Sequence, residues 1–82
     1  MEDKRIAVAA VVVDEPGAVG EVNSVLHEFS SIIIGRMGIP YRDKGVSVIS
    51  VAVDAEPDVI SNLTGRLGRI EGVSVKAAIS KK

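Results

Sequence analysis

The sequence predicts an α+β fold with the element order βαββαβ, in which four strands form one antiparallel sheet. Two kinds of segment predict it: short runs of Val, Ile and Ala that suit strands, and amphipathic segments whose apolar residues recur at helical spacing. An internal repeat supports the order. The segment VVVDEPGAVGEV, which begins at Val11, resembles VAVDAEPDVISNL, which begins at Val51. The repeat indicates two βαβ halves of nearly equal length.

The first half opens with an apolar run from Ile6 to Val13, in which every residue is β-branched or Ala. This run predicts a buried strand. Asp14 and Pro16 follow at once, and they suit the N-cap and the first turn of a helix. The apolar residues of that helix lie three or four positions apart, which predicts a single buried stripe. The stripe consists of Val19, Val22, Leu26 and Phe29, widened by Val25.

A second strand is expected to start near Ile32 and to be interrupted by glycine and proline. The interrupting residues are Gly35, Gly38 and Pro40. Residues 42–45 then have the composition of a hairpin turn, with Gly45 at the position of positive φ. The third strand is expected from Val46 to Val53.

Residues 54–58, with Asp54 as the cap, are expected to open a second helix. Its buried stripe is formed by Val59 or Ile60, then Leu63 and Leu67. Gly72 ends the connection to a last strand, in which apolar and polar residues alternate. The apolar residues of that strand are Val73, Val75, Ala77 and Ile79.

Right-handed βαβ crossovers and a closed sheet favour the strand order 4-1-3-2, with both helices on one face. This is the ferredoxin-like arrangement. The first strand is apolar on both faces, since its alternate residues are Ile6, Val8, Ala10 and Val12 on one side and Ala7, Ala9, Val11 and Val13 on the other. One helical layer covers only one face, so we expect further copies of the chain to cover the second. The alternative is that central strands are simply apolar.

Composition limits the possibilities further. Eighty-two residues, 46% of them apolar, suffice for one domain over residues 1–82 but not for two separate cores. With 2% aromatic residues and no cysteine, the core is small and lacks disulfides, which favours a homo-oligomer, a dimer or a tetramer. A formal net charge of −1 argues against direct binding to nucleic acid. The N-terminal apolar run is too short to span a membrane and has no cleavage site, which indicates a cytoplasmic protein.

Several segments resemble a known family. The segment DEPGAVGEVNSVLHEF, residues 14–29, resembles the first loop and helix of ACT-type regulatory domains. Together, IIIGRMGIPY, KGVSVIS and LTGRLGRIEGVSVK resemble the stand-alone, ACT-like family of iron-only hydrogenase system regulators, over nearly the whole chain. The resemblance implies a ferredoxin-like module that binds small molecules, often amino acids, and regulates through association. It also implies a link to an iron-only hydrogenase system.

The start of the first helix is one candidate ligand site. Gly17 has no side chain, so a ligand carboxylate or another backbone can approach the free N–H groups of the first turn. The candidate residues are Asp14, Gly17 and Ala18. The alternative is a plain capped helix, in which Gly17 serves a tight turn and Asp14 is the cap.

The second strand supplies the other candidates, Arg36, Tyr41 and Arg42. Two guanidinium groups and a phenol beside glycine can receive an anion or the carboxylates of a partner. The alternative is that glycine and proline only protect an edge strand and that Arg42 lies in a solvated hairpin tip.

Metal binding and catalysis have little support. His27 is the only histidine, and without cysteine it lacks companions within one chain for a metal site, so we expect a solvated helix residue. The alternative, which a resemblance to ACT-like nickel-responsive regulators implies, is a metal site shared between subunits. No serine has a nucleophile setting, and Asp14 and Asp54 are explained by helix capping, so no enzyme and no particular cofactor are predicted. Two functions remain: a non-catalytic regulatory or sensor module for a small ligand or partner, and a structural adaptor subunit whose segment 35–42 docks on a larger protein.

Overall fold

The computed structural model describes residues 3–81, and its main elements follow the predicted order βαββαβ. Two single turns of 3-10 helix, η1 and η2, flank the first α-helix. The elements are β1 (Arg5–Val13), η1 (Pro16–Ala18), α1 (Val19–Glu28), η2 (Ser30–Ile32), β2 (Ile33–Tyr41), β3 (Val46–Ala55), α2 (Pro57–Gly68) and β4 (Val73–Ile79). Residues 1, 2 and 82 of the expected domain lie outside the described residues.

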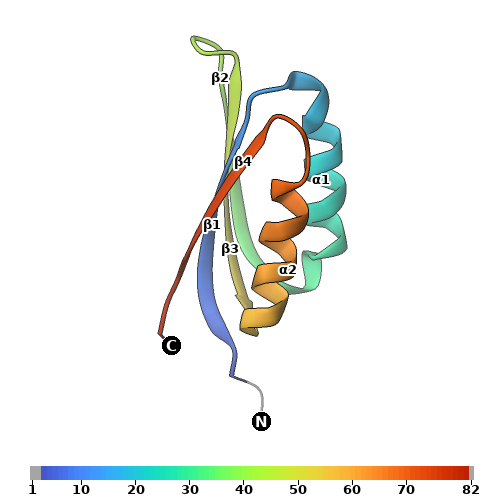
Figure 1. Ribbon diagram of the computed structural model, residues 1–82. Coiled ribbons are helices and arrows are strands. Elements are labelled where there is room, and N and C mark those ends of the chain that lie inside the picture. Colours follow the sequence, from blue (N-terminus) through green and yellow to red (C-terminus); the bar gives the residue numbers. More distant parts are fainter. Residues whose placement is uncertain (1–2, 82) are drawn as a thin grey trace.

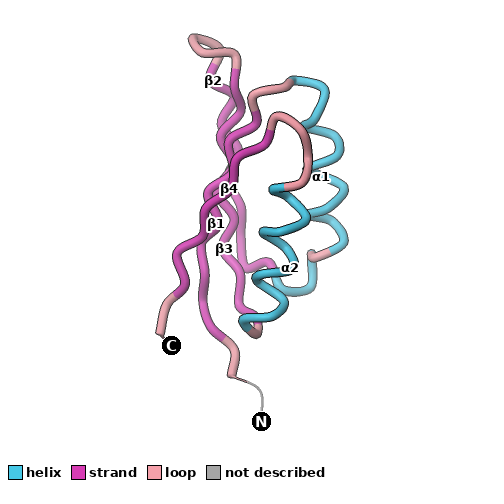
Figure 2. The backbone as a smooth tube through the Cα atoms, viewed as in Figure 1, coloured by secondary structure: helices cyan, strands magenta, loops and turns pink. Residues whose placement is uncertain are grey.

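The four strands form one antiparallel sheet in the order β2-β3-β1-β4, which is the predicted order 4-1-3-2 counted from the other edge. Both helices pack on the same face of this sheet (Figures 1 and 2). The ferredoxin-like fold is therefore confirmed. The β2–β3 hairpin extends past the helices at one end of the molecule, and β1 begins and β4 ends toward the other end (Figure 1).

The core lies between the helices and one face of the sheet. Every buried residue in the described part of the chain is apolar. The sheet contributes alternate residues of β1 and β3, and each helix contributes the predicted stripe, with Ile60 rather than Val59 buried in α2. The core residues of these four elements are Ala7, Ala9, Val11, Val13, Val22, Val25, Leu26, Ile49, Val51, Val53, Ala55, Ile60, Leu63 and Leu67.

The strand β2 is not interrupted at Gly38 or Pro40, so those two expected breaks are wrong, whereas its register against β3 does shift between Ile33 and Gly35. It runs without a gap along β3 and lies at the edge of the sheet. The irregularity is a single β-bulge: Ile33 pairs with Val53 and Gly35 with Ala52, which leaves Ile34 as an extra residue. Glycine and proline fit this strand because its outer edge has no neighbouring strand within the described chain.

The expectation that Asp14 and Asp54 cap the two helices is also wrong. Glu15, not Asp14, precedes the turn η1, and α1 begins only after it. Asp54 lies within β3, opposite Ile6 of β1, because the paired strands continue further than the apolar pattern suggests. Pro16 and Pro57 open the two helical segments, and their fixed φ suits a first helical turn.

Two connections use glycine at positive φ. Gly45 has a φ of 66° in the hairpin turn, as predicted, and Gly72 has a φ of 83° between α2 and β4. Gly72 also lies directly against Glu15, so that a Cβ atom at this position would collide with the Glu15 side chain. The Asp14 amide donates a hydrogen bond to the Gly72 carbonyl oxygen at 2.7 Å. The loops that precede α1 and β4 are thus joined at one end of the molecule.

An ion pair joins the two helices on their outer surface. Arg66 of α2 donates two hydrogen bonds to the Glu28 carboxylate, with N···O distances of 2.7 and 3.1 Å. The same guanidinium lies 5.6 Å from the centre of the Phe29 ring, which is within cation–π range. Arg66 hydrogen-bonds to Glu28 and attracts its charge, and both effects hold the pKa of that carboxyl below its ordinary value.

We expect Gly72→Ala to destabilise the fold by about 1–3 kcal/mol, since it forces an L-residue to positive φ and against Glu15. Gly68→Ala is the matched control, because a Cβ atom there has open space and α2 tolerates alanine. Urea denaturation followed by circular dichroism measures both free energies of unfolding. Equal stability of the two variants would contradict this account of Gly72.

The Glu28–Arg66 pair predicts a pH-dependent contribution to stability. The folded-state pKa of Glu28 lies below its unfolded value, so the pair stabilises the fold at neutral pH and this contribution is lost as the pH falls through the folded-state pKa. Glu28→Gln should therefore lower the melting temperature at neutral pH, and the difference from the wild type should close in acid. Glu71→Gln, at an exposed loop position, is the control. A difference that stays constant with pH would exclude this role of the ion pair.

Candidate functional site

The most prominent surface is the face of the sheet that the helices leave uncovered, which we call the open face. Cross-strand pairing places its side chains in rows that run from β2 through β3 and β1 to β4. The three central rows are Ile39, Val48, Val12 and Ser74, then Met37, Ser50, Ala10 and Lys76, then Gly35, Ala52, Val8 and Ala78. Tyr41 and Ile6 extend the apolar surface at its two ends.

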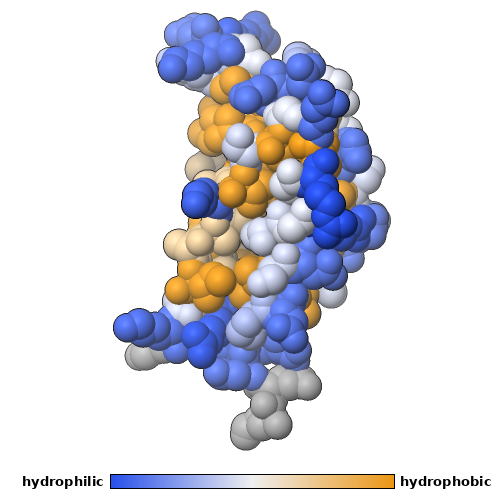
Figure 3. All heavy atoms as spheres, viewed as in Figure 1, coloured by the Kyte–Doolittle hydropathy of each residue, from blue (hydrophilic) through white to orange (hydrophobic). Residues whose placement is uncertain are grey.

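Large apolar side chains on the open face are well exposed. The exposed fraction is 44% for Val8, 60% for Met37 and 49% for Ile39. Apolar surface follows the sheet side of the molecule and is bordered by hydrophilic surface at both ends (Figure 3). The prediction that β1 and β3 carry a second apolar face is confirmed.

The size of the open face follows from the geometry of the sheet. Strand spacing of about 4.8 Å and a rise of about 3.3 Å per residue give a flat footprint of roughly 400–500 Å². Monomers rarely expose a contiguous apolar patch larger than a few hundred Å². This footprint is smaller than the roughly 800 Å² that each partner buries in an interface of standard size.

One part of the open face is hollowed, between the edge strand β2 and β3. A hollow of about 260 Å³ is lined by Gly35, Arg36, Met37, Ser50 and Ala52. The small residues of β2 and β3 form its floor, while Ile39 and Val48 lie toward one end of the face. The face thus offers relief into which apolar side chains of another protein surface can fit.

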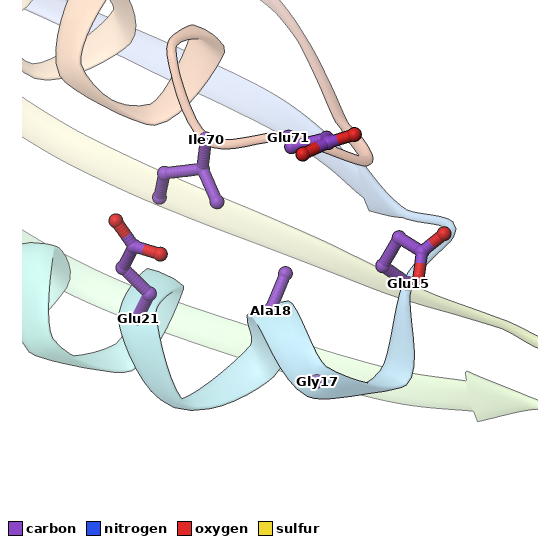
Figure 4. A pocket seen from close by; sticks show the side chains of 6 residues that line it. All are labelled: Glu15, Gly17, Ala18, Glu21, Ile70 and Glu71. Atoms are coloured by element: carbon purple, nitrogen blue, oxygen red, sulfur yellow. The ribbon is translucent and has the colours of Figure 1, made fainter.

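Gly17 and Ala18 line a different cleft, of about 320 Å³, at the end of the molecule near the hairpin. Its other lining residues are Glu15, Glu21, Ile70 and Glu71. Figure 4 shows the three glutamates around Ala18 and Ile70, from the loop before η1, from α1 and from the loop before β4. Three carboxylates beside the first turn of α1 oppose an anionic ligand there, despite the favourable helix dipole.

Arg36 lies on the helix side of the sheet, since it pairs with the buried Val51. Its Nη2 donates a hydrogen bond of 2.6 Å to Oδ1 of Asn23 on α1. Arg36 and Asn23 line a groove of about 240 Å³ between α1 and β2.

Tyr41 ends β2 and Arg42 begins the turn, so both lie exposed near the tip of the hairpin, where the alternative interpretation placed Arg42. They line a cleft of about 200 Å³ together with Val13, Pro16, Pro40, Gly45, Val46 and Ser47. Tyr41 pairs with Val46, on the opposite face of the sheet from Arg36. The three candidates of this segment therefore do not converge on one point.

A family model described as "TM1266-like: Iron-only hydrogenase system regulator, putative" matches residues 5–77. The uncharacterized protein TM1266 from Thermotoga maritima has a solved structure that is 38% identical to this chain and superposes with a TM-score of 0.91, covering 96% of this chain and 100% of that one. This chain belongs to the TM1266-like family. No curated protein matches it.

Two more distant structures show the same fold as this TM1266-like chain. The C-terminal domain of the MgtC protein from Mycobacterium tuberculosis is 18% identical, with a TM-score of 0.75, and covers 99% of this chain and 95% of that one. A formyltetrahydrofolate deformylase from Pseudomonas putida is 14% identical, with a TM-score of 0.64, and covers 89% of this chain and 28% of that one. At these identities the likeness extends to the fold alone.

The remaining candidate residues are explained locally. His27 is exposed on α1, and residues 3–81 contain no group of three or more His, Cys, Asp or Glu residues that could hold a metal ion. The Asp14 side chain is exposed, while its amide joins the loop before β4. Within the described residues, no helix is long and apolar enough to cross a membrane.

Sequence reasoning missed two features of this TM1266-like chain. One is Asn23, whose contact with Arg36 spans α1 and β2 and leaves no local signal. The other is the acidic surrounding of Gly17, which comes from three segments that are distant in the sequence. Asn23 lies four positions after the half-buried Val19, a spacing that places both residues on the same face of α1.

We expect Gly17→Ala to leave the free energy of unfolding within about 0.5 kcal/mol of the wild type, because nothing lies within 4 Å of an added Cβ atom. Chemical denaturation of both proteins measures the difference. Gly20→Ala, also in open space but within α1, is the control and should stabilise slightly. A large loss for Gly17→Ala would show that its backbone has a structural role of its own.

Proposed function

We propose that this chain is a non-catalytic regulatory domain of an iron-only hydrogenase system, which acts in the cytoplasm as a homo-oligomer and senses a small ligand or a protein partner. The observation that carries the proposal is the open face: an apolar sheet surface that the two helices of the chain do not cover. Membership of the TM1266-like family supports the regulatory role and the link to hydrogenase.

A second copy of the chain is the occupant that we propose for the open face. Two copies related by a two-fold axis would each offer the same surface, as most homodimers do. Exposed bulky side chains such as Met37 and Ile39 lie beside the hollow between β2 and β3, so side chains of two copies can interlock. Lys76 lies on the edge strand β4, where its long stem can pack while its ammonium group stays in water. A dimer, or a tetramer built from two dimers, would result.

The absence of catalysis is part of the same proposal. The Glu28 carboxyl has a lowered pKa, but its ion pair with Arg66 on the outer surface of the helices explains that shift. A proton-transfer site needs titratable groups in a shielded pocket with perturbing neighbours. The open face is instead lined by apolar and small residues, which suit association.

A structural adaptor is the second candidate, and the edge position of β2 favours it. The segment from Gly35 to Arg42 is exposed throughout, and an unpaired edge can accept a strand from a larger protein. A thermal shift panel of amino acids, nucleotides and metal ions separates the two. A bound ligand raises the melting temperature by mass action, whereas an adaptor responds to none.

We expect the purified chain to be a dimer or tetramer at micromolar concentration and Val8→Lys to be a monomer. Val8 lies in the middle of the open face, and burial of an unpaired ammonium group there would oppose association. Asn62→Lys makes the same change of charge on the exposed surface of α2 and should leave the oligomer intact. Size-exclusion chromatography with light scattering measures all three, and a monomeric wild type would refute the association.

The link to hydrogenase is tested in cells. Deletion of the gene should change hydrogenase expression or activity, and complementation with the wild type or Asn62→Lys should restore it. Complementation with Val8→Lys should fail if the oligomer is the active form. Hydrogenase expression and activity that do not change on deletion would refute the regulatory role, whatever the oligomeric state.

A further inference from the structure

A groove on the helix side of the sheet separates α1 from the edge strand β2. Its volume is about 240 Å³, somewhat below that of sites for drug-sized molecules. Most of its lining is apolar, with a few polar groups, which is the usual make-up of a small-molecule site. The lining residues are Val19, Asn23, Arg36, Gly38, Ile39, Pro40, Ser47 and Ile49.

The groove exists because β2 offers no bulky apolar side chain to α1 along this stretch. The three residues of β2 that face the helices here are Arg36, Gly38 and Pro40, as their partners on β3 show. Gly38 pairs with the buried Ile49, and a Cβ atom at Gly38 would meet only Ile49 Cγ1, at 4.0 Å. The space above Gly38 is therefore open, where a valine or isoleucine would have completed the core.

The polar groups of the groove are mainly hydrogen-bond donors. The Oδ1 atom of Asn23 already accepts a hydrogen bond from Arg36, so its amide nitrogen is left to donate. Arg36 has further N–H groups beyond the one that Asn23 occupies, and Ser47 adds a hydroxyl. None of the described residues that line the groove is Asp or Glu, in contrast to the cleft at Gly17.

We propose that this groove binds a small apolar monocarboxylate, such as a branched-chain 2-oxo acid. The carboxylate lies on Arg36 and the amide of Asn23, and the apolar part lies over Gly38 against Val19 and Ile49. A ligand with an ammonium group is disfavoured, because no carboxylate among the described lining residues would receive it. This inference rests on the proposed sensor function, and it names the site and the class of ligand.

The test uses 4-methyl-2-oxopentanoate as the probe in isothermal titration with the whole wild-type chain. Saturable binding at one site per chain is the expected result. L-leucine, which carries an ammonium group, and 3-methylbutan-1-ol, which lacks the carboxylate, should each bind at least about tenfold more weakly. Failure of the oxo acid to bind, or equal binding of all three compounds, would overturn the proposal.

Two variants locate the binding. Arg36→Met keeps the length of the side chain but removes the cation, and it should weaken binding by about tenfold or more. Gly38→Val fills the groove and should abolish binding, while the added apolar group and its strand propensity preserve the fold. Arg69→Met loses the same charge at the end of α2 and is the control that should bind like the wild type. Undiminished binding by Gly38→Val would exclude the groove.

Amide chemical shifts give a test that does not depend on the variants. In NMR spectra of the wild-type chain, the probe should shift the amides of Val19, Asn23 and Gly38 more than those of the cleft at Gly17. Shifts confined to Gly17 and Glu71 would place the ligand elsewhere and overturn the proposal. Light scattering on the same samples separates the two proposals: an oligomer that binds no acid refutes the groove alone, and a monomer that binds the acid refutes the association alone.

Discussion

The fold depends on one mismatch: the sheet has two apolar faces, and the chain has helices for only one of them. The helix side takes the larger share of the apolar residues, and α1 and α2 shield it with their buried stripes. On the other side, the same period-two alternation leaves Ile6, Val8 and Val12 without a covering layer within the chain. A core built almost without aromatic residues therefore gains further apolar burial only through another molecule.

The two proposals concern opposite faces of the same strand. Residues of β2 alternate between Met37, Ile39 and Tyr41 on the open face and Arg36, Gly38 and Pro40 on the helix face. A ligand in the groove would therefore contact the strand whose other face belongs to the proposed interface between copies. Because the two sets of side chains share one backbone, a small shift of β2 would reach both, and this is a short physical path from ligand to assembly.

The topology was predictable from sequence because local signals agree on it. The apolar run at Ile6, the helical spacing from Val19 to Leu26 and the glycine turn at Gly45 each indicate one element only, and few topologies accommodate their order. The helix caps were not predictable. Asp14 and Asp54 are residue types that often cap helices, but the length of the strand pairing, a tertiary effect, decides where each helix begins.

The candidate site was less accessible to sequence reasoning. The open face could be foreseen, because alternation along β1 fixes which residues share a side. The separation of Arg36 from Tyr41 follows from the same alternation, since residues five positions apart in a regular strand point to opposite faces, but the expected interruption of β2 hid it. Asn23 and Arg36 meet only when α1 crosses the edge strand, and no local spacing encodes that meeting.

The bulge at Ile34 has a consequence for both surfaces at once. Alternate residues of a strand point to opposite sides of the sheet. The one extra residue therefore determines which side of the sheet each following residue of β2 points to. A relative that lacked this residue but kept the rest of the strand would turn Met37, Ile39 and Tyr41 under the first helix and would present a guanidinium, a glycine and a proline outward. Such a relative would bury more apolar surface under its own helices and expose less of it on the outer face of the sheet, so a one-residue deletion would remove the surface on which the proposed association depends.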